Sequence, residues 1–214
     1  MPELIDPEVE LYADVTTTKE DALLSEIAIF TKNSHPLAHM LSGNVQGAFL
    51  SMLSHLIQPL RILEIGTFTG YSALCLASGL MPNGILHTIE LREDVANIAV
   101  QFFNKSLYRD KIILHRGNAL EIIPRLNDEW DIVFIDADKT RYIDYYELTL
   151  PKLNPKGLII ADNVLFRGQA FEKSTKNKNA LAIAQFNQHV AADRRVQQVL
   201  VTMRDGLLLI RKSS

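Results

Sequence analysis

Two aspartates, an asparagine and a lysine follow two neighbouring apolar runs and could hold a metal ion. Asp136 and Lys139 come after the run that ends at residue 135, and Asp162 and Asn163 follow the next run. If both runs are parallel strands, these side chains meet at the sheet edge where open α/β sheets bind ligands. Two carboxylates and an amide oxygen suit a hard cation, Mg²⁺ first, with Mn²⁺ or Ca²⁺ as alternatives. No histidine or cysteine stands at a matching position, which disfavours zinc.

A glycine-containing turn lies between Glu64 and Ser72, where a strand is expected to end and a helix to begin. Gly66 and Gly70 allow close approach of the backbone to a ligand, and Thr67, Ser72 and the early helix amides could bind it. The spacing is G-x-x-x-G, whereas dinucleotide-binding loops have G-x-G-x-x-G. This favours an adenosyl ligand without a pyrophosphate, S-adenosylmethionine, over an ordinary turn without a ligand.

Glu90 ends the second apolar run, and Asn118 and Ala119 follow the third. An acidic residue at the tip of the second strand of such a fold binds the ribose hydroxyls of an adenosyl cofactor. A capping or surface carboxylate is the alternative, although Glu93 or Asp94 could fill that role. Asn118 and Ala119 form a polar and small pair that could meet the adenine ring.

Lys139 lies one turn beyond Asp136 and should face the same space. A lysine beside a bound cation is pushed toward its neutral form and can then accept a proton. Methyl transfer to an alcohol or phenol requires such a base, because the hydroxyl must lose its proton. Each acidic residue taken singly is more often a turn or capping residue, so the prediction depends on the four residues together.

The elements that must position these residues alternate along the chain from residue 62. Apolar runs cover 62–65, 85–89, 112–114, 132–135 and 157–161, and segments with helical spacing cover 72–80, 93–106, 119–126 and 142–150. A helix over 179–192 is followed by runs over 196–202 and 207–210, which Asp205 and Gly206 join as a hairpin turn. The pattern predicts an α/β fold with a mostly parallel seven-stranded sheet, helices on both faces and an antiparallel C-terminal hairpin.

The first 58 residues form a different segment in this interpretation. Helices are expected over 19–31 and 45–56 around Pro36, while 2–18 carries little periodicity. We expect one domain over 1–214, with an N-terminal helical cap over 1–58 and the core over 59–214. The polar segment 167–179 is expected either as a solvated loop or as a substrate-facing one. Tyr142, Tyr145 and Tyr146 are expected to pack in the core or an interface.

Composition restricts the classes of partner. The net charge is −3, from 22 basic and 25 acidic residues, and neither sign forms a block. A nucleic-acid binder normally has a basic face, so a small-molecule substrate is favoured over tRNA, which stays the alternative acceptor. The single cysteine, Cys75, favours a reducing compartment, and no apolar run approaches the ~18 residues that span a bilayer. With no signal-peptide pattern at the start, we expect a cytoplasmic protein without membrane contact.

The chain resembles the cation-dependent class I O-methyltransferases, the group that contains catechol O-methyltransferase and the caffeoyl-CoA O-methyltransferases. The shared motifs are Leu63-Glu-Ile-Gly-Thr-Phe-Thr-Gly-Tyr-Ser72, Ile89-Glu90, Ile135-Asp-Ala-Asp-Lys139 with Tyr142, Ala161-Asp-Asn163 and Asp205-Gly206. The resemblance spans about residue 35 to the C-terminus and includes a helix with Gln46 and Gly47 before the first strand.

The resemblance implies a Rossmann-like methyltransferase fold, S-adenosylmethionine as donor, a catechol-like phenolic acceptor and a homodimer. It implies metal ligation by Asp136, Asp162 and Asn163, and a catalytic base at Lys139. The cofactor-lining residues that we expect are Met40, Glu64, Gly66, Thr67, Ser72, Glu90, Asn118, Ala119, Asp136 and Asp138. Plant members have a tryptophan after the Asp-Asn pair, where this chain has 164–168 in the sequence VLFRG, so the acceptor stays open. A non-catalytic protein that binds an adenosyl ligand is the remaining alternative.

Overall fold

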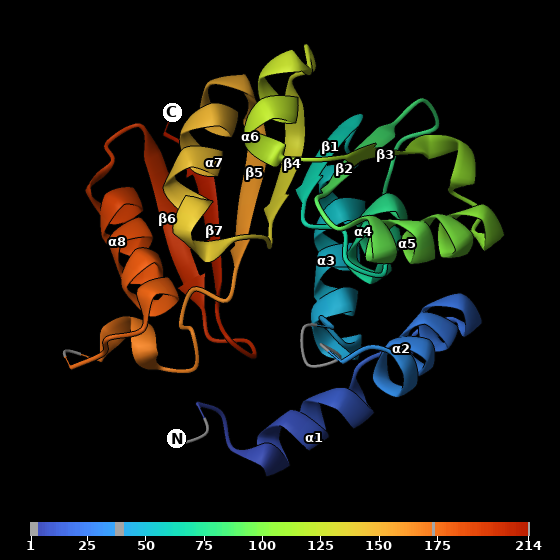
Figure 1. Ribbon diagram of the computed structural model, residues 1–214, viewed down its shortest axis with the longest axis horizontal. Helices are drawn as coiled ribbons and strands as arrows, with labels where there is room; N and C mark the ends of the chain where they lie inside the picture. The colour runs from blue at the N-terminus through green and yellow to red at the C-terminus, as the bar shows by residue number, and fades with distance from the viewer. Residues whose placement is uncertain (1–3, 37–40, 173, 214) are drawn as a thin grey trace.

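The protein is built around a seven-stranded sheet in the order β3-β2-β1-β4-β5-β7-β6 (Figure 1). A computed structural model describes residues 4–36, 41–172 and 174–213. The strands are β1 Arg61–Ile65, β2 Ile85–Glu90, β3 Ile112–Arg116, β4 Trp130–Ile135, β5 Leu153–Asp162, β6 Val196–Val201 and β7 Leu207–Lys212. Strands β1 to β5 pair in parallel, and β7 runs antiparallel to both β5 and β6. The predicted sheet and its C-terminal hairpin are confirmed.

Helices cover both faces of the sheet, as the near-continuous apolar strands predict. The helices of the described residues are α1 Pro7–Thr16, α2 Ala22–Ser34, α3 Asn44–Ile57, α4 Tyr71–Ala77, α5 Glu93–Lys105, α6 Ala119–Ile122, α7 Tyr142–Thr149 and α8 Lys178–Ala192, and all of them except α1 contribute to the two buried clusters beside the sheet. Helices α6, α7 and α8 share one buried cluster with Val133 and Ile135 of β4, and α2 to α5 share the other with Ile132 and Phe134. Alternate side chains of this central strand therefore anchor two separate cores, and all four are fully buried.

The chain reverses its direction of winding between β1 and β4, which places the carboxyl ends of these two strands side by side. Gly66 N donates to Ile89 O at 2.9 Å, and Asp136 N donates to Ile65 O at 2.9 Å, so both ladders continue past the strands. A Cβ at Gly66 would lie 2.0 Å from the backbone oxygen of Asp136, and its φ is +98°. Only glycine fits this close approach, which forms the switch point where such sheets bind ligands.

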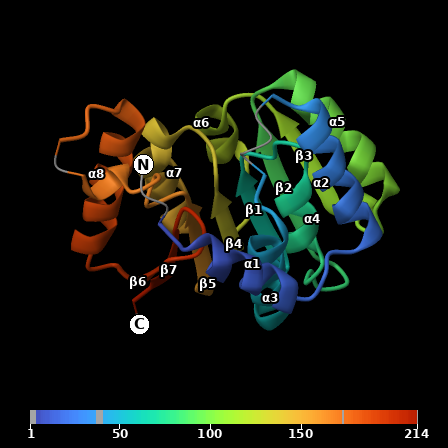
Figure 2. The ribbon, with the colours of Figure 1, turned by 90° about the horizontal axis from the view of Figure 1, so that it is seen from below.

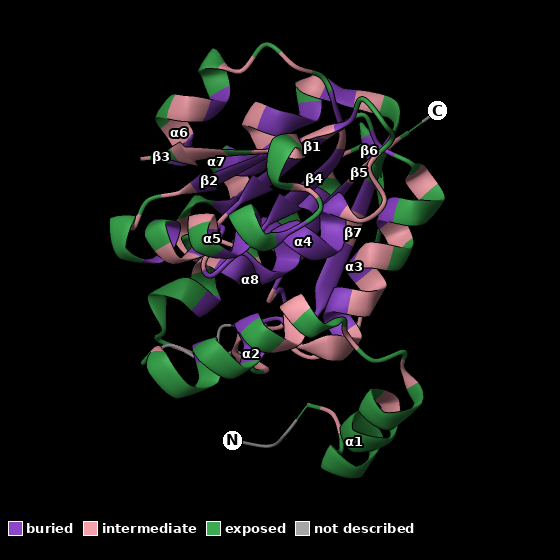
Figure 3. Cartoon of the chain, turned by 90° about the vertical axis from the view of Figure 1, so that its right-hand side faces the viewer, coloured by how far each residue is buried: buried purple, intermediate pink, exposed green. Residues whose placement is uncertain are grey.

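The N-terminal segment differs from the expectation, because residues 7–16 form helix α1 although their apolar periodicity is weak. Asp6 caps this helix by accepting from Glu8 N at 2.8 Å, and Pro7 occupies its first turn, where proline is favoured. Helix α1 buries none of its residues, contacts α3 and lies at the periphery (Figure 3). In the view from below it lies in front of the sheet, beside α3 (Figure 2). In the sequence, the capping residue Asp6 and the following Pro7 indicate this helix, whereas apolar periodicity does not.

The other element boundaries agree with the expectation to within a few residues. Helix α2 begins at Ala22, three residues later than expected, because Asp21 caps it by accepting from Leu24 N at 2.9 Å. Helix α3 ends at Ile57 and β1 begins at Arg61, on either side of the predicted 58/59 division, which stays a prediction. None of the helices in the described ranges is both long and apolar enough to cross a membrane.

Candidate active site

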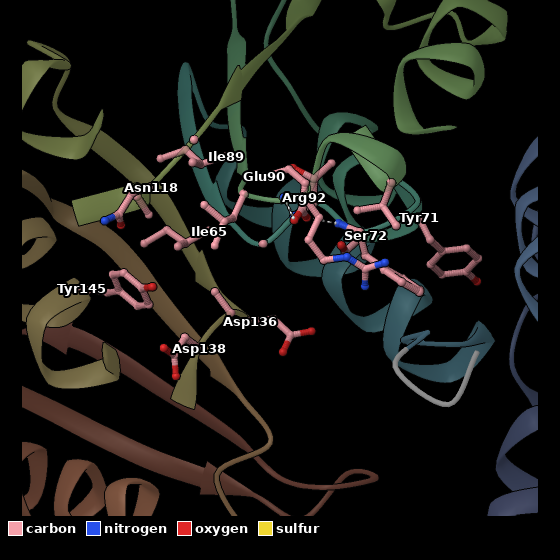
Figure 4. A pocket seen from close by; sticks show the side chains of 18 of the residues that line it. Ile65, Tyr71, Ser72, Ile89, Glu90, Arg92, Asn118, Asp136, Asp138 and Tyr145 are labelled. Carbon is pink, nitrogen blue, oxygen red and sulfur yellow. Dashed lines mark hydrogen bonds between the residues drawn. The ribbon is translucent and has the colours of Figure 1, made fainter. Parts of the chain in front are cut away.

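Two cavities lie at the carboxyl edge of the sheet and share the segment Asp136–Asp138. The first has a volume of about 340 Å³ and is lined by the loops that follow β1, β2, β3 and β4. Figure 4 shows Asp136, Asp138 and Tyr145 on one side of this cavity, and Glu90, Arg92 and Ser72 on the other. The second has a volume of about 950 Å³ and is lined by the ends of β4 and β5, the loop after β5, the β6–β7 turn and the N-terminal segment.

Most of the expected cofactor residues line the first cavity. These are Gly66, Thr67, Ser72, Glu90, Asn118, Ala119, Asp136 and Asp138. Met40 lies outside the described residues. Glu64 is not among the lining residues, because its carboxyl is fully buried beneath Ser72. In the segment from Glu64 to Ser72, Gly66, Thr67 and Ser72 thus line the cavity, whereas Glu64 supports Ser72 from behind.

Glu64 is buried behind the wall of the first cavity, where it holds the side chain of Ser72. Ser72 Oγ donates to Glu64 Oε1 at 2.6 Å, and Thr88 Oγ1 donates to Oε2 at 2.5 Å. Burial raises the pKa of Glu64 to about 8, and its two hydroxyl partners oppose the shift only in part. Burial thus favours the protonated form of this carboxyl, and in that form one of its two hydroxyl partners would accept a hydrogen bond from it.

Glu90 lines the first cavity and also holds its walls in place. Its Oε2 accepts from Thr67 N at 3.2 Å and from Phe68 N at 2.8 Å, and its Oε1 accepts from Arg92 N at 2.9 Å. Phe68 has a left-handed φ of +49°, so this carboxylate offsets the strain of the turn. Glu90 thus has a structural role in the cavity wall, and its role in ligand binding stays a prediction.

Asn118 and Tyr145 each have a structural role and also line the first cavity. Asn118 Oδ1 accepts from Leu120 N at 3.1 Å and caps α6, while the residue also lines the first cavity. Tyr145 packs in the buried cluster beside β4, as expected, and it also lines this cavity. Its helical spacing gave no sign that the residue also borders a cavity.

The four residues expected at the metal site converge at the border of the two cavities. Lys139 Nζ donates at 2.7 Å to Asp136 Oδ1, Asn163 Oδ1 and Tyr142 Oη. Asp162 is 3% exposed and accepts from Asn163 N through Oδ1 at 2.6 Å. The ends of β4 and β5 thus bring these residues together as their spacing predicted.

The electrostatics of this cluster favour an added positive charge. Burial raises the pKa of Asp162, and the charge of Asp136 raises it further, whereas Lys139 opposes the shift. One ammonium group thus only partly offsets two carboxylates in a largely buried place. Within the described ranges no group of three or more histidine, cysteine, aspartate or glutamate residues could hold a metal ion. Any cation here would depend on Asn163 as well as the two carboxylates.

Gln46 is a residue of this cluster that sequence reasoning did not identify as functional. It is 1% exposed, and its Nε2 donates to Asp162 Oδ2 at 2.6 Å. The two residues are 116 positions apart, and the sequence carries no signal that joins them. Tyr142, expected in the core, is likewise buried but donates to Asp162 O at 3.0 Å.

The loop after β5 forms a wall of the second cavity and is held in an unusual backbone conformation. Asn163, Phe166 and Arg167 all have left-handed φ values, between +46° and +59°. Leu165 N donates to Asp205 O at 2.9 Å, and Asp205 Oδ1 accepts from Arg167 N. The segment 167–179 contributes Arg167, Gln169, Asn177 and Asn179 to the cavity lining. It therefore borders the cavity, as the substrate-facing alternative requires.

Comparison with known protein families places the chain among enzymes. The family model described as O-methyltransferase matches residues 14–213. The chain is 32% identical over 195 residues to a catechol O-methyltransferase of Niastella koreensis, with 89% of this chain and 87% of that protein covered. It is 33% identical over 193 residues to a probable caffeoyl-CoA O-methyltransferase of Dictyostelium discoideum, with 87% and 84% covered.

Solved structures share the whole fold. The methyltransferase PaMTH1 of Podospora anserina, bound to SAH, gives a TM-score of 0.91 at 26% identity, with 100% of this chain and 98% of that one covered. The O-methyltransferase TomG of Streptomyces achromogenes, in complex with SAM, gives 0.87 at 29% identity, with 97% and 96% covered. The fold is thus the Rossmann-like fold of methyltransferases, as expected. From its sequence and its structure, this chain belongs to the O-methyltransferase family of enzymes.

Proposed function

We propose that the protein transfers a methyl group from S-adenosylmethionine to one hydroxyl of a catechol-like small molecule, with the help of a divalent cation. One observation carries this proposal. Lys139 Nζ lies 2.7 Å from both Asp136 Oδ1 and Asn163 Oδ1, and Asp136 lines both cavities. One cavity suits the donor and the other the acceptor, so the reacting atoms would meet beside Lys139.

The assignment of the donor to the first cavity rests on its lining and on the solved relatives. Two similar solved structures, PaMTH1 and TomG, are bound to SAH and to SAM respectively. Ser72 and the amides at the start of α4 suit the polar amino-acid end of S-adenosylmethionine. Glu90 suits the ribose hydroxyls of the same molecule, because a carboxylate can accept a hydrogen bond from each. We assign donor binding to the cavity residues Gly66, Thr67, Ser72, Glu90, Asn118, Ala119, Asp136 and Asp138, with Glu64 in support and Met40 as a prediction outside the described residues.

The donor set at the second cavity fits a divalent cation. Asp136 Oδ1 and Asn163 Oδ1 both accept from one ammonium group, so their oxygens already face a shared positive charge. Carboxylate and amide oxygens are the ligands that Mg²⁺ prefers, and Mn²⁺ and Ca²⁺ accept the same set. Asp136, Asp162 and Asn163 would hold the ion, which would supply Lewis acidity that lowers the pKa of an acceptor hydroxyl.

The residues around this point would then perform three tasks. Lys139 would accept the hydroxyl proton on Nζ. The acceptor oxygen forms a bond to the methyl carbon as the carbon–sulfur bond breaks, and the electron pair stays on sulfur. Asp136 and Asp138 border both cavities and keep the two substrates in reach of each other, which removes most of the entropic cost of their encounter.

A vicinal diphenol is the acceptor class that this site supports best. Two adjacent hydroxyl oxygens can both approach one cation, and relatives carry names of catechol and caffeoyl-CoA O-methyltransferases. The wall formed by Phe166, Arg167 and Arg204 would then select among such acceptors. A cytoplasmic location, expected from the sequence, stays a prediction.

We also propose that the protein forms a homodimer through the N-terminal helices. Leu11, Tyr12 and Val15 of α1 are at least 60% exposed, and Met52 and Leu56 of α3 are at least 62% exposed. Exposed apolar side chains gathered on two helices in contact commonly mark a protein–protein interface. A second copy of the chain is the expected occupant, as the family resemblance implies.

An acceptor panel tests the proposed function. Methyl transfer from labelled S-adenosylmethionine would be measured with caffeate, with its singly hydroxylated analogue coumarate and with tRNA, all with Mg²⁺. We expect turnover of caffeate alone. Methylation of tRNA without turnover of caffeate would move the function to the nucleic-acid alternative, and equal turnover of coumarate would remove the need for two hydroxyls.

A further inference from the structure

We infer that Gln46, held in orientation by Arg204, is a positioning residue for Asp162 and sets the cation affinity of the site. This inference rests on the proposed function, because it assigns a role toward the proposed cation. It concerns two residues of the chain that lie on different elements, the first turn of α3 and the β6–β7 turn.

The contact between Gln46 and Asp162 is buried and directional. Gln46 is 1% exposed and Asp162 3% exposed, so bulk water solvates neither side chain. Nε2 of Gln46 donates to Oδ2 of Asp162 at 2.6 Å, while Asn163 N donates to Oδ1 at 2.6 Å. One donor on each oxygen fixes the plane of the carboxylate. A carboxylate has about four acceptor positions, so two stay available for a cation.

Arg204 determines which way the Gln46 amide points. Its Nη1 lies 3.4 Å from Gln46 Oε1 and donates to Leu41 O at 2.8 Å. A flipped amide would turn its oxygen toward the Asp162 carboxylate and its NH₂ group toward the guanidinium, and both contacts would be repulsive. The guanidinium therefore selects the amide orientation that donates to Asp162.

A neutral donor is the appropriate partner for a carboxylate that must keep its charge for a cation. Lys139 neutralises Asp136 and would compete with a bound ion, because it brings a charge of the same sign. Gln46 stabilises the ionised carboxylate of Asp162 without such competition. Partners of this kind orient metal ligands, and their removal commonly lowers metal affinity by about tenfold to a hundredfold.

The test measures Mn²⁺ binding to the metal-stripped full-length protein by electron paramagnetic resonance, with no acceptor present. The variants are Gln46→Met, which keeps most of the side-chain volume and removes the donor, and Arg204→Met. Ser54→Ala is the matched control, because Ser54 is also fully buried on α3 and donates to Leu76 O at 2.6 Å, away from the site. Arg211→Met, an exposed arginine of the same hairpin, controls for Arg204.

We expect Gln46→Met to weaken Mn²⁺ binding about tenfold to a hundredfold and to broaden the spectrum of the bound ion, and Arg204→Met to weaken it less. Both controls should bind Mn²⁺ within about twofold of the parent, even where Ser54→Ala lowers the melting temperature as much as Gln46→Met does. Equal Mn²⁺ affinity of Gln46→Met and the parent would overturn the inference and leave the proposed function intact. A parent that binds S-adenosylmethionine but no Mn²⁺ would overturn the cation part of the proposed function, and this inference with it.

Discussion

Lys139 Nζ, in the segment that follows β4, lies 2.7 Å from Oδ1 of Asn163, the residue directly after β5. The same ammonium donates to Asp136, so it bridges two of the three side chains that we propose as cation ligands. A divalent ion and the lysine ammonium would compete for the same oxygens. In the proposed function Asp136 and Asn163 would hold the ion, and Nζ of Lys139 would then be free of these contacts beside the proposed acceptor hydroxyl.

Replacement of Lys139 by methionine should remove the general base and keep the donor cavity. We expect kcat to fall about a hundredfold or more, because positioned general bases contribute ~10²–10⁴-fold. The dissociation constant of S-adenosylmethionine, from calorimetry, should change little. Lys156→Met, at an exposed position of β5, serves as the control. A kcat within twofold of the parent would contradict the role of Lys139 as the base.

Replacement of Glu90 by glutamine should weaken binding of the donor. The carboxylate accepts three backbone hydrogen bonds from the walls of the first cavity, in addition to its proposed contact with ribose. Loss of charge-assisted bonds costs ~1.5–3 kcal/mol, which is about tenfold to a hundredfold in the dissociation constant of S-adenosylmethionine. Glu93→Gln, at the exposed rim, should bind as the parent does. Unchanged affinity in Glu90→Gln would remove Glu90 from the binding site.

Stability should depend on pH through the buried carboxyl of Glu64. Its pKa is raised from 4.5 to about 8 by burial, so the folded state holds a proton that the unfolded state has lost between these values. The stabilisation is present below pH 4.5 and is lost as pH rises through 8, with a magnitude of roughly 3–5 kcal/mol. Asp162 contributes a slope of the same sign, since its pKa is also raised.

Glu64→Gln should therefore flatten, but not abolish, the fall in the free energy of unfolding between pH 5 and pH 8.5. Urea titrations of the ligand-free protein at a series of pH values measure this slope. The exposed Glu121→Gln should keep the parent slope. If Glu64→Gln keeps it too, the carboxyl is ionised in the folded protein throughout this range.

The proposed dimer predicts a change of mass when the apolar face of α1 is made charged. Leu11→Lys places a charge at a side chain that is 64% exposed in the single chain, so it should disfavour association and leave the fold unchanged. Sedimentation equilibrium should give a dimer for the parent and for Asp14→Asn, and a monomer for Leu11→Lys. A monomeric parent would remove the dimer proposal, and a dimeric Leu11→Lys would move the interface elsewhere.

The sheet and the convergence of its acidic ends were predictable because both depend on local patterns. Apolar runs over 132–135 and 157–161 mark strands that are buried on both faces, and parallel strands bring the residues after them to one edge. Asp136 and Asp162 follow from this rule without any knowledge of side-chain contacts. The position of Glu90 follows in the same way.

Other parts of the site could not be predicted, because they depend on contacts between distant segments. Gln46 belongs to a helix whose spacing only indicates packing, and its partner Asp162 is 116 positions away. Glu64 belongs to the same motif as Ser72, but whether its carboxyl faces the cavity or lies beneath it depends on Thr88 of the neighbouring strand. Helix α1 was missed for a different reason, since its boundaries come from the cap at Asp6 rather than from apolar periodicity.

The most direct test of cation-dependent methyl transfer is the initial rate of caffeate methylation through one cycle of metal removal and return. The rate would be measured with Mg²⁺, after EDTA and gel filtration, and after Mg²⁺ is added again, with S-adenosylmethionine binding followed at each step. We predict that metal removal abolishes turnover, that the donor still binds, and that added Mg²⁺ restores the original rate. A rate of caffeate methylation that EDTA leaves unchanged would contradict the account.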